Sequence, residues 1–226
     1  MLRSLFALTA LSVALLAGAA QAAPDLVVNG SFEQTTIPTG TKDYFQNKVT
    51  GWTGGAALTF LASPGTADDG SYLSVYKGFP TNSPDGGRFV LADGDPAYSS
   101  AISQTINGLV VGGSYELKFF QAAGQQAGFK GATTEQWQVT FGNQTKLSSL
   151  FSLPEGGTGQ WQAQSMTFVV KAASQVLSFL ASGTPNGAPP ISFLDGVSLV
   201  QVPEPVTLSL LGTGLLGLGL LRRRKA

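Results

Sequence analysis

The side chains able to do chemistry in this 226-residue chain are mainly carboxylates, because the sequence contains neither His nor Cys. Ser-His-Asp and Cys-His catalysis are therefore excluded, and so is a conventional zinc site. Paired carboxylates can still hydrolyse glycosides when about 5 to 9.5 Å separates them. The candidates are Asp93-Gly94-Asp95, Asp68-Asp69 and Asp85. Turn formation accounts for these acidic runs more simply, since Gly or Pro lies nearby. Binding of a calcium ion by these acidic turns is a further alternative.

Asp195 lies within an apolar strand pattern that covers residues 191–200. It shares parity with Ile191, Phe193, Val197 and Leu199, which predicts a carboxylate on the core-facing side of the strand. Burying an unpaired carboxylate is costly, so we expect a cation or hydrogen-bond donors beside it. The alternative is that Asp195 opens a tight turn with the glycine that follows it.

Aromatic side chains outside the core pattern are the candidates for binding sugars, which stack on exposed rings beside polar groups. The set comprises Tyr44, Trp52, Tyr76, Phe79, Tyr98 and Phe129. Tyr76 and Phe79 flank Lys77-Gly78 in a loop-like stretch and are the preferred pair. Trp52 has a core position as its alternative. The glutamines of residues 121–126 are candidates for a polar rim.

The elements that position these side chains are β-strands, because apolar residues recur with a period of two. The predicted strands are residues 25–28, 57–61, 72–76, 88–92, 101–106, 115–121, 137–141, 166–170, 176–181 and 191–200. Glycine-containing turns such as Asp69-Gly70, Asn107-Gly108 and Asn186-Gly187 separate them. Many short strands without a long amphipathic helix predict an all-β sandwich.

The C-terminal end has three parts. Val202, Pro203, Glu204 and Pro205 are followed by an apolar run at 206–221 and then by Arg222, Arg223, Arg224 and Lys225. A helix over this run would rise about 24 Å, slightly less than the roughly 30 Å hydrocarbon core. We expect a single transmembrane helix whose basic end stays cytoplasmic, so that the residues before Pro203 lie outside.

The N-terminal end has the pattern of a secretory signal peptide. Arg3 precedes an apolar stretch at 5–16, and Ala20-Gln21-Ala22 supplies a cleavage site after Ala22. The chain therefore divides into a signal peptide at 1–22, a β-sandwich domain at 23–201 and a sorting and anchor segment at 202–226.

The formal net charge of zero conceals an acidic exported domain. Five of the 13 basic residues lie in the targeting segments, but only one of the 13 acidic residues does. The domain carries 8 basic and 12 acidic residues, a net charge of −4. Nucleic acid binding is not expected, because it requires clustered cations. A mildly acidic surface suits solubility or a cation such as calcium.

The C-terminal segment resembles the PEP-CTERM sorting signal of Gram-negative bacteria. The resemblance rests on the order of the Pro-Glu-Pro motif, the apolar run and the basic end. It implies an exosortase as partner, with cleavage near Pro203-Glu204-Pro205. It also implies transient anchorage in the inner membrane, followed by release or re-attachment at the cell surface or in the extracellular matrix.

Three further segments resemble the galactose-binding-like jelly-roll superfamily, and more narrowly its choice-of-anchor and plant cell-wall-protein relatives. They are 27–33 (VVNGSFE) with Gly51-Trp52, 102–109 (ISQTINGL) with Gly112 and 115–119 (YELKF), and 193–199 (FLDGVSL). The resemblance implies a jelly-roll sandwich that brings Glu33 close to Asp195. In similar modules these two positions and nearby backbone carbonyls bind a structural calcium, with a solvated Glu33 as the alternative.

These observations predict an exported, non-catalytic surface or matrix protein that binds carbohydrate or exopolysaccharide. One alternative is a purely structural surface component without glycan binding. The other is a glycoside hydrolase that uses carboxylates such as Asp93 and Asp95.

Overall fold

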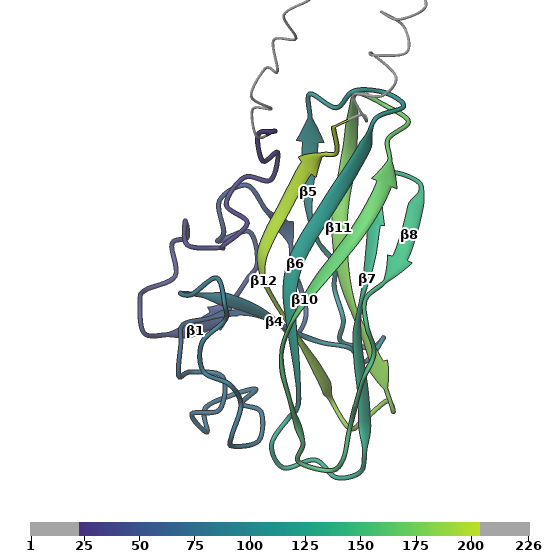
Figure 1. Cartoon of the computed structure of the whole chain (residues 1–226). Coiled ribbons are helices and arrows are strands. Elements are labelled where there is room, and N and C mark those ends of the chain that lie inside the picture. The colour runs from purple at the N-terminus through teal and green to yellow at the C-terminus, as the bar shows by residue number, and fades with distance from the viewer. Residues whose placement is uncertain (1–22, 204–226) are drawn as a thin grey trace, which may run out of the picture.

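The computed structural model describes residues 23–203, which form two antiparallel β-sheets packed face to face (Figure 1). The strands are β1 (Lys42–Tyr44), β2 (Thr53–Gly54), β3 (Thr59–Ala62), β4 (Phe89–Asp93), β5 (Ile102–Asn107), β6 (Ser114–Gln125), β7 (Thr133–Phe141), β8 (Gln144–Leu147), β9 (Phe151–Leu153), β10 (Thr158–Val169), β11 (Ser174–Thr184) and β12 (Pro190–Gln201). The predicted all-β class is confirmed. In this part of the chain, no helix long enough to cross a membrane is present.

The strand order is that of a jelly roll. The first sheet has the order β1-β3-β4-β12-β6-β10, and the second has the order β2-β5-β11-β7-β8, with β9 also paired to β7. The four strands β4-β12-β6-β10 face β5-β11-β7-β9, and the chain moves repeatedly from one sheet to the other. Two interlocked Greek keys of this kind define the jelly roll, so the predicted architecture is confirmed.

The main core fills the space between the two sheets. Burial alternates residue by residue along β7, as expected for a strand with one face on the core. Phe179 of β11 meets Phe119 and Trp137 edge-on, with ring centroids 5.3 and 6.1 Å apart. The indole Nε1 of Trp137 donates a 2.9 Å hydrogen bond to the carbonyl of Phe193, which links the two sheets.

A second hydrophobic cluster covers part of the outer face of the first sheet. The irregular segment 64–88 folds over β4 and β12 and contributes Leu73, Val75 and Phe79. Phe79 stacks on Phe193 with ring centroids 4.0 Å apart. Strands β3 and β4 are buried on both faces as a result, and therefore show no polar alternation.

The prediction that Ile191, Phe193, Val197 and Leu199 share one face of the strand is wrong. A β-bulge interrupts the pairing of β12 with β6 between Asp195 and Ser198, and Gly196 has a φ of 58°. The extra residue reverses the alternation. Phe193 consequently belongs to the outer cluster, whereas Val197 lies between the sheets. Asp195 points to the same side as Phe193, so it is buried on the outer side of the first sheet and not between the sheets.

Two predicted strands are absent from the described residues. Segment 25–28 runs beside β12, where the Leu26 N–H donates to the Leu199 carbonyl at 2.9 Å, but it forms no ladder. Segment 72–76 contributes only an isolated bridge between Val75 and Gln126. Leu73 has a φ of 57°, which is incompatible with an extended strand. Both segments pack apolar side chains against the sandwich without the geometry of a strand. Their sequences therefore resemble the alternating pattern of a strand.

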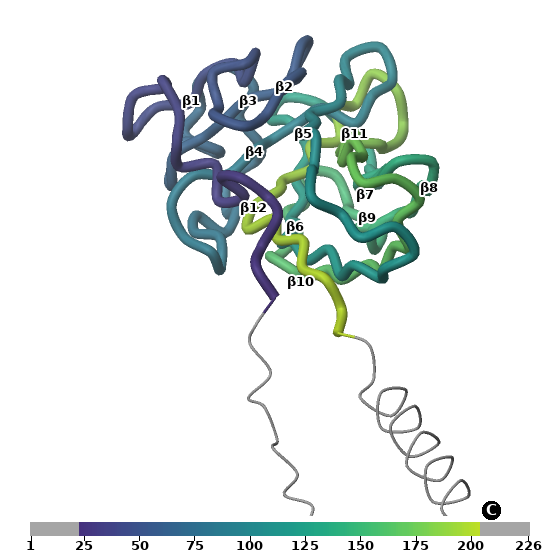
Figure 2. The backbone as a smooth tube through the Cα atoms, turned by 90° about the horizontal axis from the view of Figure 1, so that it is seen from above, coloured from purple at the N-terminus to yellow at the C-terminus, as the bar shows by residue number. Residues whose placement is uncertain are grey.

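Residues 23 and 203 leave the sandwich at the same end (Figures 1 and 2). The predicted signal peptide at 1–22 and the predicted transmembrane segment with its basic end lie outside the described residues, as do Glu204 and Pro205.

Candidate functional site on the outer face of the first sheet

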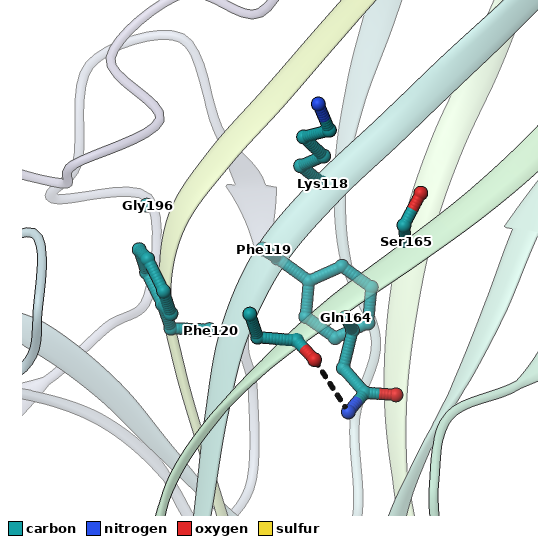
Figure 3. Close-up of a pocket in the computed structure, with 7 residues that line it drawn as sticks. Lys118, Phe119, Phe120, Gln164, Ser165 and Gly196 are labelled. Carbon is teal, nitrogen blue, oxygen red and sulfur yellow. Dashed lines mark hydrogen bonds between the residues drawn. The ribbon is translucent and has the colours of Figure 1, made fainter.

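An apolar cleft of about 210 Å³ opens on the outer face of the first sheet, where β6 lies between β12 and β10 (Figure 3). It is lined by Lys118, Phe119, Phe120, Ala163, Gln164, Ser165 and Gly196. Lys118 and Phe120 face outward because they alternate with buried residues along β6. In the register with β10, Ala163 pairs with Phe120 and Ser165 pairs with Lys118. These small partners leave space above the Phe120 ring.

The β12 side of the cleft depends on the bulge glycine. A Cβ atom at Gly196 would lie 2.8 Å from the Phe120 ring and 3.1 Å from Cβ of Asp85. The positive φ and the close approach both require glycine at this position. The bulge therefore shapes the cleft wall and lets the half-buried Phe120 ring lie against β12 (Figure 3).

Polar groups surround this apolar floor. The Lys118 ammonium lies 3.0 Å from Oε2 of Glu116, and the Ser165 hydroxyl donates to Oε1 at 2.8 Å. The hydrogen bonds from Ser165 and Lys118 hold the pKa of Glu116 below its ordinary value. Gln164 donates from Nε2 to the Ala163 carbonyl at 3.1 Å. An aromatic ring beside ionic and amide groups can take both the apolar face and the hydroxyls of a sugar.

A second, polar cavity of about 260 Å³ lies on the other side of the bulge. It is lined by Asp25, Gly30, Ser31, Asp85, Gly196, Val197 and Ser198. The N-terminal segment reaches it because the Val197 N–H donates to the Gly30 carbonyl at 3.0 Å. A Cβ atom at Gly30 would lie 1.8 Å from the Val197 carbonyl oxygen, so only glycine allows this approach.

Asp195 lies fully buried beside this cavity. Its Oδ1 accepts a 2.8 Å hydrogen bond from the Gly196 N–H, whereas Oδ2 has no hydrogen-bond partner among residues 23–203. The pKa of Asp195 is raised to about 8, mainly by burial and also by the negative charges of Asp85 and Glu33, whereas hydrogen bonds from the Ser83 hydroxyl and the Gly196 amide oppose the shift. The orphaned oxygen marks this carboxylate as a group that needs a proton or a cation.

Glu33 and Asp195 are brought into one region, with Asp85 as a third carboxylate that sequence reasoning assigned to a turn. Glu33 is exposed; its Oε1 accepts a 2.5 Å hydrogen bond from the Arg88 N–H, and its Oε2 lies 3.9 Å from Arg88 Nε. Within the described range, no three acidic side chains converge closely enough to hold a metal by themselves. A cation here would need ligands from backbone carbonyl, hydroxyl or water oxygens as well.

The prediction that Trp52 and Phe79 offer free ring faces to a sugar is wrong, and the core position given as the alternative for Trp52 is confirmed. Trp52 is only 2% exposed and packs against Phe32 at 5.2 Å between ring centroids, and its Nε1 donates to the Asn29 carbonyl. Phe79 is 4% exposed because it stacks on Phe193. Loop-like sequence around both residues folds back onto the sandwich and buries the rings.

Tyr76 is half-buried, and its role as a ligand residue stays a prediction. Its hydroxyl donates a 2.6 Å hydrogen bond to the Phe129 carbonyl, and its ring lies beside Gly156. The Tyr76 N–H bonds to the carbonyl of Gln125, at the end of β6 and five residues beyond Phe120. Tyr76 is therefore not part of the cleft.

Sequence reasoning missed two outward-facing aromatic residues, the half-buried Phe120 and the exposed Tyr72. Phe120 shares the outward parity of Glu116 and Lys118, and this parity was a readable signal. Tyr72 is 62% exposed and lies 6.4 Å from Tyr44 and 5.9 Å from Phe60 between ring centroids. The false strand at 72–76 concealed this aromatic group.

The carboxylates of the remaining acidic runs accept structural hydrogen bonds, although Oδ2 of Asp93 has no partner among residues 23–203. Buried Asp93 accepts from the Asp95 N–H at 2.8 Å, and buried Asp95 accepts from the amides of Ala97 and Gly187. Burial opposes ionisation of Asp69, but hydrogen bonds from Ser71 and Ser74 and the nearby Lys42 lower its pKa to about 2. These carboxylates act in turns and loops, and none of them lines either cavity.

The family model of the PEP-CTERM protein-sorting motif matches residues 201–225, a range that includes Val202-Pro203-Glu204-Pro205 and the basic end. No curated protein matches the chain. Among solved structures, the carbohydrate-binding module TmCBM61 in complex with β-1,4-galactotriose is 15% identical, with a TM-score of 0.45 and coverage of 79% of this chain and 99% of that one. The CBM22-1 xylan-binding domain of Paenibacillus barcinonensis Xyn10C is 14% identical, with a TM-score of 0.45 and coverage of 83% and 100%.

A bacteriophage CBA120 tailspike enzymatic domain is also similar, at 13% identity and a TM-score of 0.39, over 79% of this chain and 21% of that one. Similarities this distant carry no assignment of function. The sorting motif is specific by comparison, and it marks the chain as an exported protein that is anchored in a membrane before it is processed.

Proposed function

We propose that the exported domain is a non-catalytic carbohydrate-binding module that an exosortase sorts to the surface or extracellular matrix of a Gram-negative bacterium. The cleft over Phe120 is the observation that carries this proposal. It combines an accessible aromatic ring with the Lys118–Glu116 pair, Ser165 and Gln164. Its apolar floor suits the C–H face of a pyranose ring, and its rim suits the hydroxyls.

A third cavity, of about 320 Å³, fits a sugar less well. It lies on the second sheet and is lined by Val28, Gly51, Thr53, Ser103, Gln104 and Thr105. None of these residues is aromatic, so the cavity lacks a stacking platform. The cleft over Phe120 therefore remains the better candidate for the glycan site.

Binding without catalysis is favoured by the placement of Asp93 and Asp95. A glycosidase needs two carboxylates that face its substrate across a cleft. Asp93 and Asp95 are buried and hydrogen-bonded to backbone amides, away from both cavities on the first sheet. A structural surface component without saturable glycan binding is the competing proposal.

Replacing Phe120 by Ala should lower glycan affinity at least tenfold, because the stacking surface is lost. The measurement is a screen of residues 23–203 on a glycan array and on the host's exopolysaccharide, followed by calorimetric titration with the best ligand. Tyr72→Ala is the matched control, since it removes an exposed ring outside the cleft. No saturable binding by the parent protein would contradict the glycan proposal. Loss of binding in Tyr72→Ala alone would contradict the choice of cleft.

We also propose a structural calcium ion beside Asp195, with Asp85 or Glu33 and backbone carbonyls as further oxygen ligands. The orphaned Oδ2 and the repulsion that Asp85 and Glu33 exert on Asp195 support this proposal. Such an ion would clasp the N-terminal segment to β12, close to the contact between Gly30 and Val197. Its role would be stabilisation of the fold.

Chelation by EDTA at pH 8 should lower the melting temperature of the domain, and added CaCl₂ should restore it. Calcium at a hundredfold excess over its Kd would contribute about 2.7 kcal/mol, or roughly 5 to 10 °C for a domain of this size. Asp195→Asn should abolish the response, because the amide removes the charge that holds the ion. An identical melt of the parent protein with and without EDTA would refute the calcium site.

A further inference from the structure

The end of the sandwich from which residue 203 leaves carries a group of exposed valines. We call these four residues the valine rim; they are Val110, Val111, Val169 and Val202, which are 54%, 60%, 38% and 39% exposed. The Gly113 N–H donates to the Val110 carbonyl, and the Val202 N–H donates to the Ser114 carbonyl. Val169 pairs with the same Ser114. The four side chains therefore gather around the start of β6, at the upper end in Figure 1.

This end of the domain also carries few charged residues. Its loops are 107–113, 142–143, 170–174 and 201–203, and Lys171 is the only ionisable side chain that they contain. Two carboxylates lie nearby: Glu116 is paired to Val200, and the exposed Asp25, on the N-terminal segment at this end, accepts a hydrogen bond from the Leu199 amide. The domain as a whole has 12 acidic side chains. Because only Asp25 and Glu116 of these lie near this end, repulsion between the end and an anionic surface is small.

The sequence that follows places this end next to a bilayer. The apolar run begins at Val206, and the three residues from Pro203 to that point can span at most about 11 Å when fully extended. The sorting motif anchors the precursor in a membrane through this segment. The valine rim is therefore held within a short tether of the lipid headgroups.

We propose that the valine rim is a membrane-contact surface that rests on the anionic lipid bilayer while the precursor is anchored. The valines enter the headgroup region, and Lys171 lies near the lipid phosphates. Four side chains make a weak contact by themselves. The tether makes the contact intramolecular, so it forms in the precursor and is lost once the tail is cut.

The absence of Cys from the chain allows a direct test, because one introduced thiol is labelled uniquely. The full precursor, reconstituted in vesicles of phosphatidylethanolamine and phosphatidylglycerol, carries an NBD fluorophore at Val111→Cys. The control carries it at Asn186→Cys, an exposed position in the β11–β12 loop at the opposite end. We expect a blue-shifted emission at position 111, quenched by headgroup-region spin-labelled lipid at least threefold more strongly than at position 186.

Adding Val110→Asp should reduce the quenching at position 111 at least twofold, and Val110→Ser should reduce it less. A tail-less 23–203 fragment should show little quenching with the same vesicles. Equal quenching at positions 111 and 186 in the precursor would overturn the proposal. So would a blue shift that follows protein concentration and persists without lipid, because it would assign the rim to contacts between copies of the chain.

Discussion

Replacing Glu135 by Gln is expected to raise the free energy of unfolding by about 3 kcal/mol at pH 8 and to leave it nearly unchanged at pH 4. Glu135 faces the interior of the sandwich from β7, with 1% of its surface exposed. Neither carboxylate oxygen has a hydrogen-bond partner in the described part of the chain. Burial raises the pKa of Glu135 from 4.5 to about 7, and the Thr133 hydroxyl opposes the shift only in part. Each pKa unit corresponds to about 1.36 kcal/mol.

The sign of this pH dependence follows from proton binding. Between pH 4.5 and about 7, the folded protein holds a proton on Glu135 that the unfolded chain has released. Stability from this group is therefore fully present below pH 4.5 and is lost as the pH rises to about 7. Gln is isosteric and does not titrate, so the variant avoids the loss.

The measurement is denaturant unfolding of parent and variant at pH 4, 6 and 8. The difference between the two proteins isolates Glu135 from Asp93 and Asp195, whose pKa values burial also raises, to about 6 and about 8. Glu155→Gln is the control, because this exposed residue should change stability by less than about 0.5 kcal/mol. A difference between Glu135→Gln and the parent that stays constant from pH 4 to pH 8 would show that burial does not raise this pKa.

Replacing Phe79 by Ala is expected to cost about 3 to 5 kcal/mol of stability and to leave glycan affinity unchanged. Its ring stacks on Phe193 and meets Phe89 and Trp161 at centroid distances of 5.9 and 6.1 Å. Removing the ring would leave a cavity under segment 64–88. The sequence pattern instead favours Phe79 as a ligand residue, so the variant separates the two roles.

Stability of Phe79→Ala is measured by denaturant unfolding, and glycan binding is measured well below its melting temperature. Tyr98→Ala serves as the control for an aromatic side chain on the surface, since Tyr98 is 49% exposed. We expect its effect on stability to stay within about 0.5 kcal/mol. A Phe79→Ala protein that is stable but no longer binds glycan would show that Phe79 contributes to glycan binding.

The sandwich could be predicted from sequence because most of its strands have one face on the core. The period-two patterns at 115–121, 137–141 and 176–181 correspond to β6, β7 and β11. Strands buried on both faces were also found, because β4 is a short continuous apolar run with turn residues nearby. The signal peptide and the sorting segment could be predicted from the composition of each end and the order of its parts, which require no knowledge of the fold.

The candidate site could not be predicted as well, because it depends on two departures from regular strand geometry. The bulge at Gly196 reverses the parity of β12, so Asp195 and Val197 face opposite sides despite their spacing. Segment 64–88 buries Phe79 through contacts with residues far away in the sequence. Phe120 was the recoverable exception, since it shares parity with the charged residues of β6 while the flanking Phe119 points into the core.

A titration of ¹⁵N-labelled residues 23–203 with the oligosaccharide that binds best tests the central claim most directly. If the domain is a carbohydrate-binding module that uses the cleft, saturable shift changes should concentrate on the amides of Lys118, Phe120, Ser165 and Gly196. The outer face of the second sheet should stay unchanged. Shift changes centred on that face or on Tyr72 and Tyr44 would contradict the choice of cleft. The absence of a saturable change with any tested glycan would contradict carbohydrate binding itself.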